Sequence, residues 1–232
     1  MCYTAAMDEN LQKILRFLLE IDKMKSVYRK NILADGSRNE TDAEHSWHMA
    51  VCAVALQKYA PKGTDLCRAI ELCLVHDLVE VYAGDTFAFD FEAVKSQPER
   101  EKAAAKKLFS ILPEEEKERF FALWEEFERG ETKEAIYAQA LDRFQPLVLN
   151  LATDGAPWAL CHATRSQVER RLLPVKAGMP ALWDYVEHEL DLYVERGFVA
   201  PDGEGKAKHR GRKARGFKIA APGSEEEARN KN

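Results

Sequence analysis

Apolar residues recur every three or four positions along most of the chain, a spacing that places them on one face of a helix. Leu11, Leu15 and Leu18 begin this pattern, so we expect a first amphipathic helix over about residues 9–25. The same spacing predicts further helices over residues 42–59, 65–82, 92–111, 114–129 and 132–152, and a last helix between Pro180 and Gly197.

Two capping-box patterns mark expected helix starts. Thr41 is followed three residues later by Glu44, and Ser166 is followed by Glu169. In a capping box the hydroxyl and the carboxylate each accept a hydrogen bond from the backbone N–H of the other residue. We therefore expect one helix to begin near Asp42 and another near residue 167.

Segments without helical spacing are short. Residues 31–42 contain Asp-Gly, Ser and Asn, which are typical of a loop. Residues 86–91 alternate apolar and polar side chains, which would suit a short strand, but no partner strand is evident and a loop with aromatic anchors is favoured. The sequence therefore predicts an all-α fold, with the helices packed as a bundle.

The composition is that of a folded protein in water. Hydrophobic residues make up 46% of the 232 residues and charged residues 31%, and the formal net charge of -5 argues against a general nucleic-acid binder. Five cysteines without C-x-x-C spacing indicate free thiols in a reducing compartment. We expect neither a signal peptide nor a membrane span, and hence a cytoplasmic protein.

The C-terminal residues differ from the rest. Residues 201–232 are rich in Gly, Lys, Arg and Glu, and seven basic residues fall between Lys206 and Lys218. Because such a segment cannot bury a core, we expect one domain over residues 1–200 followed by a basic, flexible tail. The tail is interpreted as solvated, with weak attraction to nucleic acid or other phosphate-rich partners as the alternative.

Four side chains of metal-ligand type occur in helices that are expected to be buried. His45 lies at the start of one helix, His76 and Asp77 are adjacent in the most apolar helix, and Asp142 lies in a third. Two imidazoles and two carboxylates suit Mn, Fe, Co or Zn better than a soft metal. Each residue alone has an ordinary interpretation, such as a core histidine, a cap or a salt bridge, so it is the combination that predicts a metal site.

Two further acids follow the His-Asp pair. Glu80 is four residues after His76 and three after Asp77, so on a helix it shares their face. Asp85 comes directly after Gly84, where that helix should end. A carboxylate near a metal ion can orient a water molecule or take its proton. The alternatives are an exposed helix charge for Glu80 and a turn residue for Asp85.

The order His45, His76-Asp77, Asp142 resembles the signature of the HD-domain superfamily of metal-dependent phosphohydrolases. The segments DAEHSWHMA, LVHDLVEVYAGD and ALDRFQPLVLN are similar to those of bacterial 5′-deoxynucleotidases and their HD-containing relatives. The resemblance covers roughly residues 9–195. It implies an all-helical homodimer that binds one divalent cation, with Mn or Co favoured and Zn, Fe, Ni or Mg as alternatives.

The resemblance also implies a reaction, the hydrolysis of a (deoxy)nucleoside 5′-monophosphate to nucleoside and phosphate. It makes His45, His76, Asp77 and Asp142 the metal ligands, and places Glu80 near the attacking water and Asp85 near the substrate.

By the same resemblance Arg29 contacts the substrate phosphate, assisted by Lys30 or Arg38. The chain departs from the subgroup at Lys30, where deoxynucleotidases have Trp, and this puts a preference for deoxyribose in doubt. Two-metal members place extra histidines between the doublet and the last Asp. This chain has none between His76 and Asp142, which favours a single metal ion.

Three other functions remain open from the sequence. The same site could serve a different HD-type nucleotide phosphohydrolase or a phosphodiesterase. It could hold metal and nucleotide without catalysis, or the protein could act as a nucleic-acid adaptor through its basic tail. The presence of Glu80 and Asp85 favours an enzyme, since a structural metal would not need them.

Overall fold

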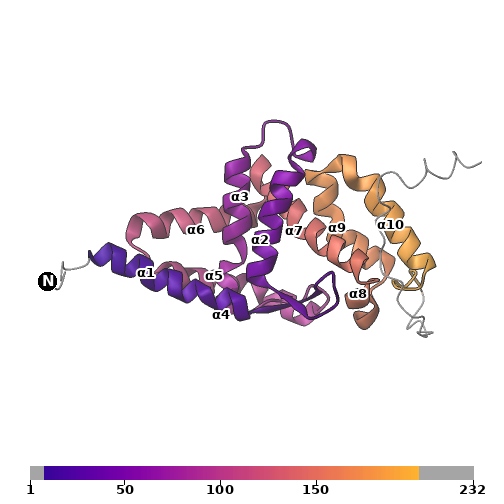
Figure 1. Cartoon of the computed structure of the whole chain (residues 1–232), viewed down its shortest axis with the longest axis horizontal. Helices are drawn as coiled ribbons and strands as arrows, with labels where there is room; N and C mark the ends of the chain where they lie inside the picture. The colour runs from indigo at the N-terminus through magenta and orange to yellow at the C-terminus, as the bar shows by residue number, and fades with distance from the viewer. Residues whose placement is uncertain (1–7, 204–232) are drawn as a thin grey trace, which may run out of the picture.

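The computed structural model describes residues 8–203, except for the side chain of residue 91, and it is helical with one small hairpin (Figure 1). This confirms the all-α class. The expected tail from Lys206 to Lys218 lies outside the described residues, so the domain boundary stays a prediction. The helices are α1 (Glu9–Ile21), α2 (Asp42–Ala55), α3 (Leu66–Val75), α4 (Glu80–Ala83), α5 (Phe91–Phe109), α6 (Glu114–Arg129), α7 (Lys133–Ala152), α8 (Ala156–Cys161), α9 (Arg165–Gly178) and α10 (Trp183–Glu195), and short 3₁₀ turns are η1 (Asp22–Ser26), η2 (Gln57–Tyr59), η3 (His76–Val79) and η4 (Pro180–Leu182).

Helix α7 runs through the middle of the molecule, with α2 and α3 on one side and α9 on the other (Figure 1). Its small residues Ala135, Ala138 and Ala140 are fully buried, which lets neighbouring helices approach its backbone closely. The hydroxyl of Tyr137 donates to the carbonyl oxygen of Ala53 at 2.9 Å and so ties α7 to α2. Any side chain on the inner faces of these helices therefore has a well-fixed position.

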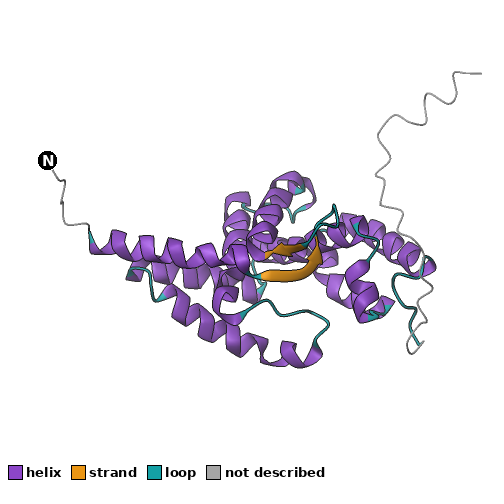
Figure 2. Cartoon of the chain, turned by 60° about the horizontal axis from the view of Figure 1, so that its bottom comes forward, coloured by secondary structure: helices purple, strands orange, loops and turns teal. Residues whose placement is uncertain are grey.

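The segment expected as a loop over residues 31–42 is partly a β-hairpin, with β1 (Tyr28–Ile32) antiparallel to β2 (Asn39–Thr41) (Figure 2). Gly36 supplies the left-handed turn with a φ of 74°. The strand register shifts between Tyr28 and Ile32, the stretch of β1 that contains Arg29. The sequence pattern missed these strands because they are too short to show alternation.

The helix expected over residues 65–82 is broken. α3 ends at Val75, and the 3₁₀ turn η3 and the short helix α4 follow. The cause is local: the His76 ring Nδ1 lies 2.9 Å from the carbonyl oxygen of Cys73. In a continuous α-helix that carbonyl would accept from the N–H of Asp77, so the ring competes with the helical hydrogen bond. The break lies at the His-Asp pair itself.

The first capping box is present as expected at Thr41 and Glu44, but the second lies elsewhere. α9 starts two residues early, because Thr164 and Gln167 form the box. The backbone N–H of Ser166 instead donates to Asp202 at 3.1 Å. α8 was not predicted, whereas the helices over α5, α6, α7 and α10 are confirmed within a few residues.

Within the described residues no helix is long and apolar enough to cross a bilayer.

The contact between α7 and α9 requires glycine at residue 178. A Cβ atom on Gly178 would lie 2.6 Å from the Cβ of Ala140 and 2.6 Å from the carbonyl oxygen of Ile136. We expect Gly178→Ala to push the helices apart and lower the free energy of unfolding by about 1–3 kcal/mol, measured by urea denaturation. Ala177→Gly, an exposed neighbour, is the control and should cost less than about 1 kcal/mol. Equal stability of Gly178→Ala and the wild type would show that the helix pair can spread freely.

Candidate metal centre

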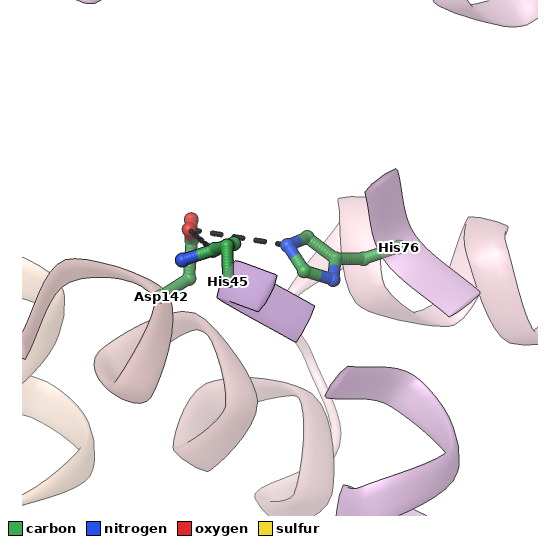
Figure 3. A group of neighbouring side chains, drawn as sticks. All are labelled: His45, His76 and Asp142. Carbon is green, nitrogen blue, oxygen red and sulfur yellow. Dashed lines mark hydrogen bonds and ion pairs between the residues drawn. The ribbon is translucent and has the colours of Figure 1, made fainter. Parts of the chain in front are cut away.

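The four predicted ligands come together at one point between α2, η3 and α7, and Figure 3 shows three of them. The Nε2 atom of His45 lies 3.1 Å from Oδ1 of Asp142 and 3.8 Å from Oδ2 of Asp77. The Nε2 atom of His76 lies 3.1 Å from Oδ2 of Asp77 and 3.9 Å from Oδ1 of Asp142. Residues almost 100 positions apart thus present two nitrogen and two oxygen atoms to one small space.

Both imidazole rings are held so that their Nε2 lone pairs face this space. Nδ1 of His45 is 2.8 Å from the amide oxygen of Gln145, and Nδ1 of His76 is 2.9 Å from the carbonyl oxygen of Cys73. Both partners are hydrogen-bond acceptors, so each ring can donate from Nδ1 and offer the lone pair of Nε2 to a cation. Nε2 of His76 is buried and has no hydrogen-bond partner among the described residues. A cation would satisfy it.

The donor set fits a divalent metal ion. Ligand atoms of His45, His76 and Asp142 all lie within 4.8 Å of one another, and all three residues are buried. Burial and the nearby Arg29 lower the pKa of His45, so its ring is neutral and able to bind metal. Mixed imidazole and carboxylate donors suit the borderline cations Mn, Fe, Co and Zn.

A second group of acids adjoins the ligands. Oxygen atoms of Asp42, Asp77 and Glu80 lie within 4.8 Å of one another. Burial raises the pKa of Asp42 to about 7, and burial together with the charge of Asp77 raises the pKa of Glu80. Three carboxylates this close cannot all be charged without a neighbouring cation.

Arg29, on β1, supplies one such cation from within the chain. Its Nη1 atom lies 2.8 Å from Asp77, 3.4 Å from Asp42 and 4.0 Å from Asp85. The residue is only 8% exposed. Burial alone would lower its pKa, but the surrounding carboxylates, Asp77 first, outweigh burial and raise it. Arg29 therefore lies at the site as the sequence predicts, and in this structure its charge is taken up by acids.

A protein-family model matches the part of the chain that contains these residues. The model described as "HD domain" matches residues 21–183. The chain belongs to the HD domain family. All four converging side chains, together with Arg29, fall within the matched region of this HD domain.

Relatives of the HD domain have also been described. The 5′-deoxynucleotidase HDDC2 of Homo sapiens is 30% identical over 138 residues, which is 59% of this chain and 66% of that protein. The Mus musculus protein of the same name is 29% identical over 136 residues, covering 58% of this chain and 67% of its own. The chain thus matches about two thirds of the length of these relatives.

A solved structure is similar over nearly its whole length. It is the crystal structure of a predicted metal-dependent phosphohydrolase from Magnetospirillum magnetotacticum, 42% identical in sequence with a TM-score of 0.79. The likeness covers 83% of this chain and 96% of the other.

A cleft opens from the metal centre of the HD domain and has two parts. Asp85, Arg143 and Arg171 line both of them. The polar part adjoins the metal centre and is lined also by Glu80, Glu101 and Glu128. The second part carries most of the apolar side chains, namely Phe87, Phe89, Pro146, Leu147, Pro157, Trp158, Val168 and Leu172, and it also includes Lys30.

The loop that carries Asp85 is tied down by Arg100 of α5. The Arg100 guanidinium donates to the carbonyl oxygen of Ala83 at 2.8 Å and to the hydroxyl of Thr86 at 2.7 Å. Asp85 is thereby fixed at the junction of the two parts of the cleft. Arg38 is not at the site, because its side chain pairs with Glu44 on the surface.

Gln145 is a site residue that was not predicted. Its amide accepts from His45 and donates to Glu40 at 2.7 Å, and its nitrogen lies 3.0 Å from Nδ1 of His48. A fully buried glutamine one turn after Asp142, in an otherwise apolar run, is the signal that could have revealed it. His48 thus joins the hydrogen-bond network that holds His45 through this amide.

Gln145→Leu should weaken metal binding without unfolding the protein. The change removes the acceptor for His45 Nδ1, so the ring no longer has a fixed tautomer and orientation. Loss of such a partner typically lowers metal affinity about 10–100-fold. Titration calorimetry with Mn would measure it, with the exposed Gln57→Leu as the matched control. Wild-type affinity in folded Gln145→Leu would show that His45 is oriented by packing alone.

Proposed function

We propose that this HD domain hydrolyses (deoxy)nucleoside 5′-monophosphates to nucleoside and phosphate with one divalent cation. The observation that carries the proposal is the meeting of two imidazole Nε2 atoms and two carboxylates at the end of a cleft that turns apolar away from them. Support comes from the relatives, named 5′-deoxynucleotidase, and from the similar structure, named a metal-dependent phosphohydrolase.

His45, His76, Asp77 and Asp142 would hold the cation. We favour Mn or Co as the cation, and Zn, Fe, Ni and Mg are the alternatives. When bound, the cation supplies Lewis-acid polarisation of the phosphoryl group and eases deprotonation of the attacking water.

Glu80 is the candidate for taking the proton of that water. It is buried and lines the polar part of the cleft, and burial together with the charge of Asp77 raises its pKa, which makes it a better proton acceptor than an ordinary carboxylate. Asp85, at the junction with the apolar part, is placed to hold the substrate.

The apolar part of the cleft would take the nucleoside. Phe87, Phe89 and Trp158 offer the flat surfaces that a base needs, while Lys30 reaches this part from β1. The charged Lys30 provides no flat surface against a deoxyribose ring, so we propose that both ribo- and deoxynucleotides are substrates.

Two other functions for the same site are disfavoured by the residues that line it. A phosphodiesterase must hold groups on both sides of the phosphorus, and here the polar part of the cleft is lined mainly by charged side chains, including the buried Glu101, rather than by apolar ones. A non-catalytic metal site would have no use for Glu80 and Asp85 beside the ligands. Activity on diesters, or metal binding without any hydrolysis, would favour these alternatives in turn.

The test is phosphate release from a panel of ribo- and deoxynucleoside 5′-monophosphates. Metal-stripped protein should be inactive and should recover with Mn or Co. Asp77→Ala should lose both metal binding and turnover, because it removes a ligand. Glu80→Gln should bind metal normally and lose about 10²–10⁴-fold in kcat, as expected when a proton acceptor is removed.

The two variants separate the roles of metal and acid. Circular dichroism would confirm that both are folded, since Asp77 also balances Arg29. Normal turnover in Asp77→Ala would overturn the metal assignment. Metal-loaded wild-type protein that releases phosphate from no nucleotide would overturn the proposed substrate.

We also propose that the protein is a homodimer through α1. Its side facing away from Phe17 exposes Leu11, Leu15, Leu18 and Leu19, with exposed fractions of 44%, 40%, 51% and 76%. An apolar stripe on a helix surface marks an interaction site. A second copy is the occupant that the family resemblance implies.

The described cysteines are unpaired, which supports a cytoplasmic location.

The double variant Leu15→Glu, Leu18→Glu should convert the dimer to a monomer by placing charge in the apolar contact. Light scattering coupled to size-exclusion chromatography would measure the mass. Arg16→Glu introduces the same side chain away from the stripe and should leave the dimer intact. A wild-type protein of monomer mass, or a dimer that survives the double change, would contradict this arrangement.

A further inference from the structure

Three arginines line the polar part of the cleft, but only one of them has a charge that no acid takes up directly. Arg29 is paired with Asp77 and Asp42. Arg143 pairs with Asp142. Arg171, on α9, makes no ion pair or hydrogen bond with any part of the chain that the structure describes. Arg171 is therefore the arginine that can bind an incoming anion without first breaking an ion pair with a carboxylate.

Arg171 lies where such an anion would have to be. Its side chain lines the polar part of the cleft together with His76, Asp77 and Asp142, and it also lines the apolar part. Part of its surface is open to solvent although many protein atoms surround its guanidinium in the cleft, so a ligand can reach it. A phosphate bound at the metal centre and attached to a nucleoside in the apolar part would pass beside this guanidinium.

The backbone that carries Arg171 is fixed, although the side chain is free. Its neighbour Leu172 and Val168, one turn earlier, are buried, and α9 packs directly on α7. The same helix pair is held close by Gly178. The base of the arginine is thus anchored to the helix that supplies Asp142, while its end can move toward a ligand.

The electrostatic surroundings favour an anion. Burial within the cleft, followed by repulsion from Arg143, lowers the pKa of Arg171 to about 9, with a further contribution from Arg29. The cationic form is therefore disfavoured by its surroundings, and a phosphate dianion would relieve both the desolvation and the repulsion. A guanidinium also matches the geometry of phosphate oxygens with two parallel hydrogen bonds.

We propose that Arg171 is the residue that binds the phosphate group of the substrate, whereas Arg29 holds Asp77 in place. This inference rests on the proposed function for the identity of the substrate, but the site it describes would bind any phosphate monoester or free phosphate. The proposal differs from the expectation drawn from the resemblance, which gave the phosphate contact to Arg29.

The first experiment measures binding of inorganic phosphate and needs no turnover. Mn-loaded wild-type protein and Arg171→Gln would be titrated with phosphate by calorimetry. We expect Arg171→Gln to bind phosphate at least about tenfold more weakly, as for the loss of a charge-assisted hydrogen-bonded pair. Affinity for Mn should be unchanged, since Arg171 contacts none of the four ligands. A loss of Mn affinity would mark a structural role and count against the proposal.

Two further variants sharpen the result. Arg170→Gln removes the same charge one residue away, on a side chain that does not line the metal cleft, and should bind phosphate as the wild type does. Arg171→Lys keeps the charge without the fork and should fall between the wild type and Arg171→Gln. If Arg170→Gln weakened phosphate binding equally, the effect would come from the overall positive charge of α9, and the specific site at Arg171 would be overturned.

A nucleotide arm separates this inference from the proposed function. If nucleoside 5′-monophosphates are substrates, Arg171→Gln should raise KM at least about tenfold, while the inhibition constant of the nucleoside product, which lacks phosphate, should not change. Wild-type phosphate affinity in Arg171→Gln overturns the role of Arg171 whatever the substrate is. Inactivity of the wild type on every nucleotide, with phosphate binding lost in Arg171→Gln, overturns only the proposed substrate and supports the phosphate site.

Discussion

The site depends on the compensation of buried negative charge. Asp42, Asp77, Glu80 and Asp142 lie together among helices where few water molecules could solvate them, and Arg29 is the cation from within the chain that reaches most of them. One guanidinium cannot balance the charge of four carboxylates. The negative charge that is left uncompensated contributes to the raised pKa values of Asp42 and Glu80. A divalent cation between the two imidazoles would complete the balance, so metal binding and the stability of this region are coupled.

The convergence of the candidate ligands was predictable from the sequence because they are chemically distinctive residues in helices with clear periodicity. His45, His76, Asp77 and Asp142 are brought together as expected, as are Glu80, Asp85 and Arg29. What the sequence could not supply is how they are oriented. The tie between His45 and Gln145 joins residues 100 positions apart, and no local pattern encodes such a contact.

The errors in the predicted elements have local causes. Periodicity continued through residues 76 and 77, but the ring of His76 takes the carbonyl oxygen of Cys73 and ends the α-helix there. A pattern of apolar positions indicates which side chains are buried. It does not indicate where a side chain replaces a backbone hydrogen bond of the helix. The hairpin was missed for a similar reason, because its role is to aim Arg29 rather than to bury an apolar face.

These departures lie where the function is. Adjacent residues of a helix point about 100° apart, yet the side chains of His76 and Asp77 meet at 3.1 Å where the helix changes to a 3₁₀ turn. Likewise Arg29, which contacts the acids, lies on β1 in the stretch where the strand register shifts. Regular elements build the frame of α7, α3 and α2, and irregular ones set the side chains on it. In this frame Arg29 lies against the acids, whereas α9 brings to the same cleft a guanidinium without an ion pair among the described residues, which is why the proposed anion site is placed on α9.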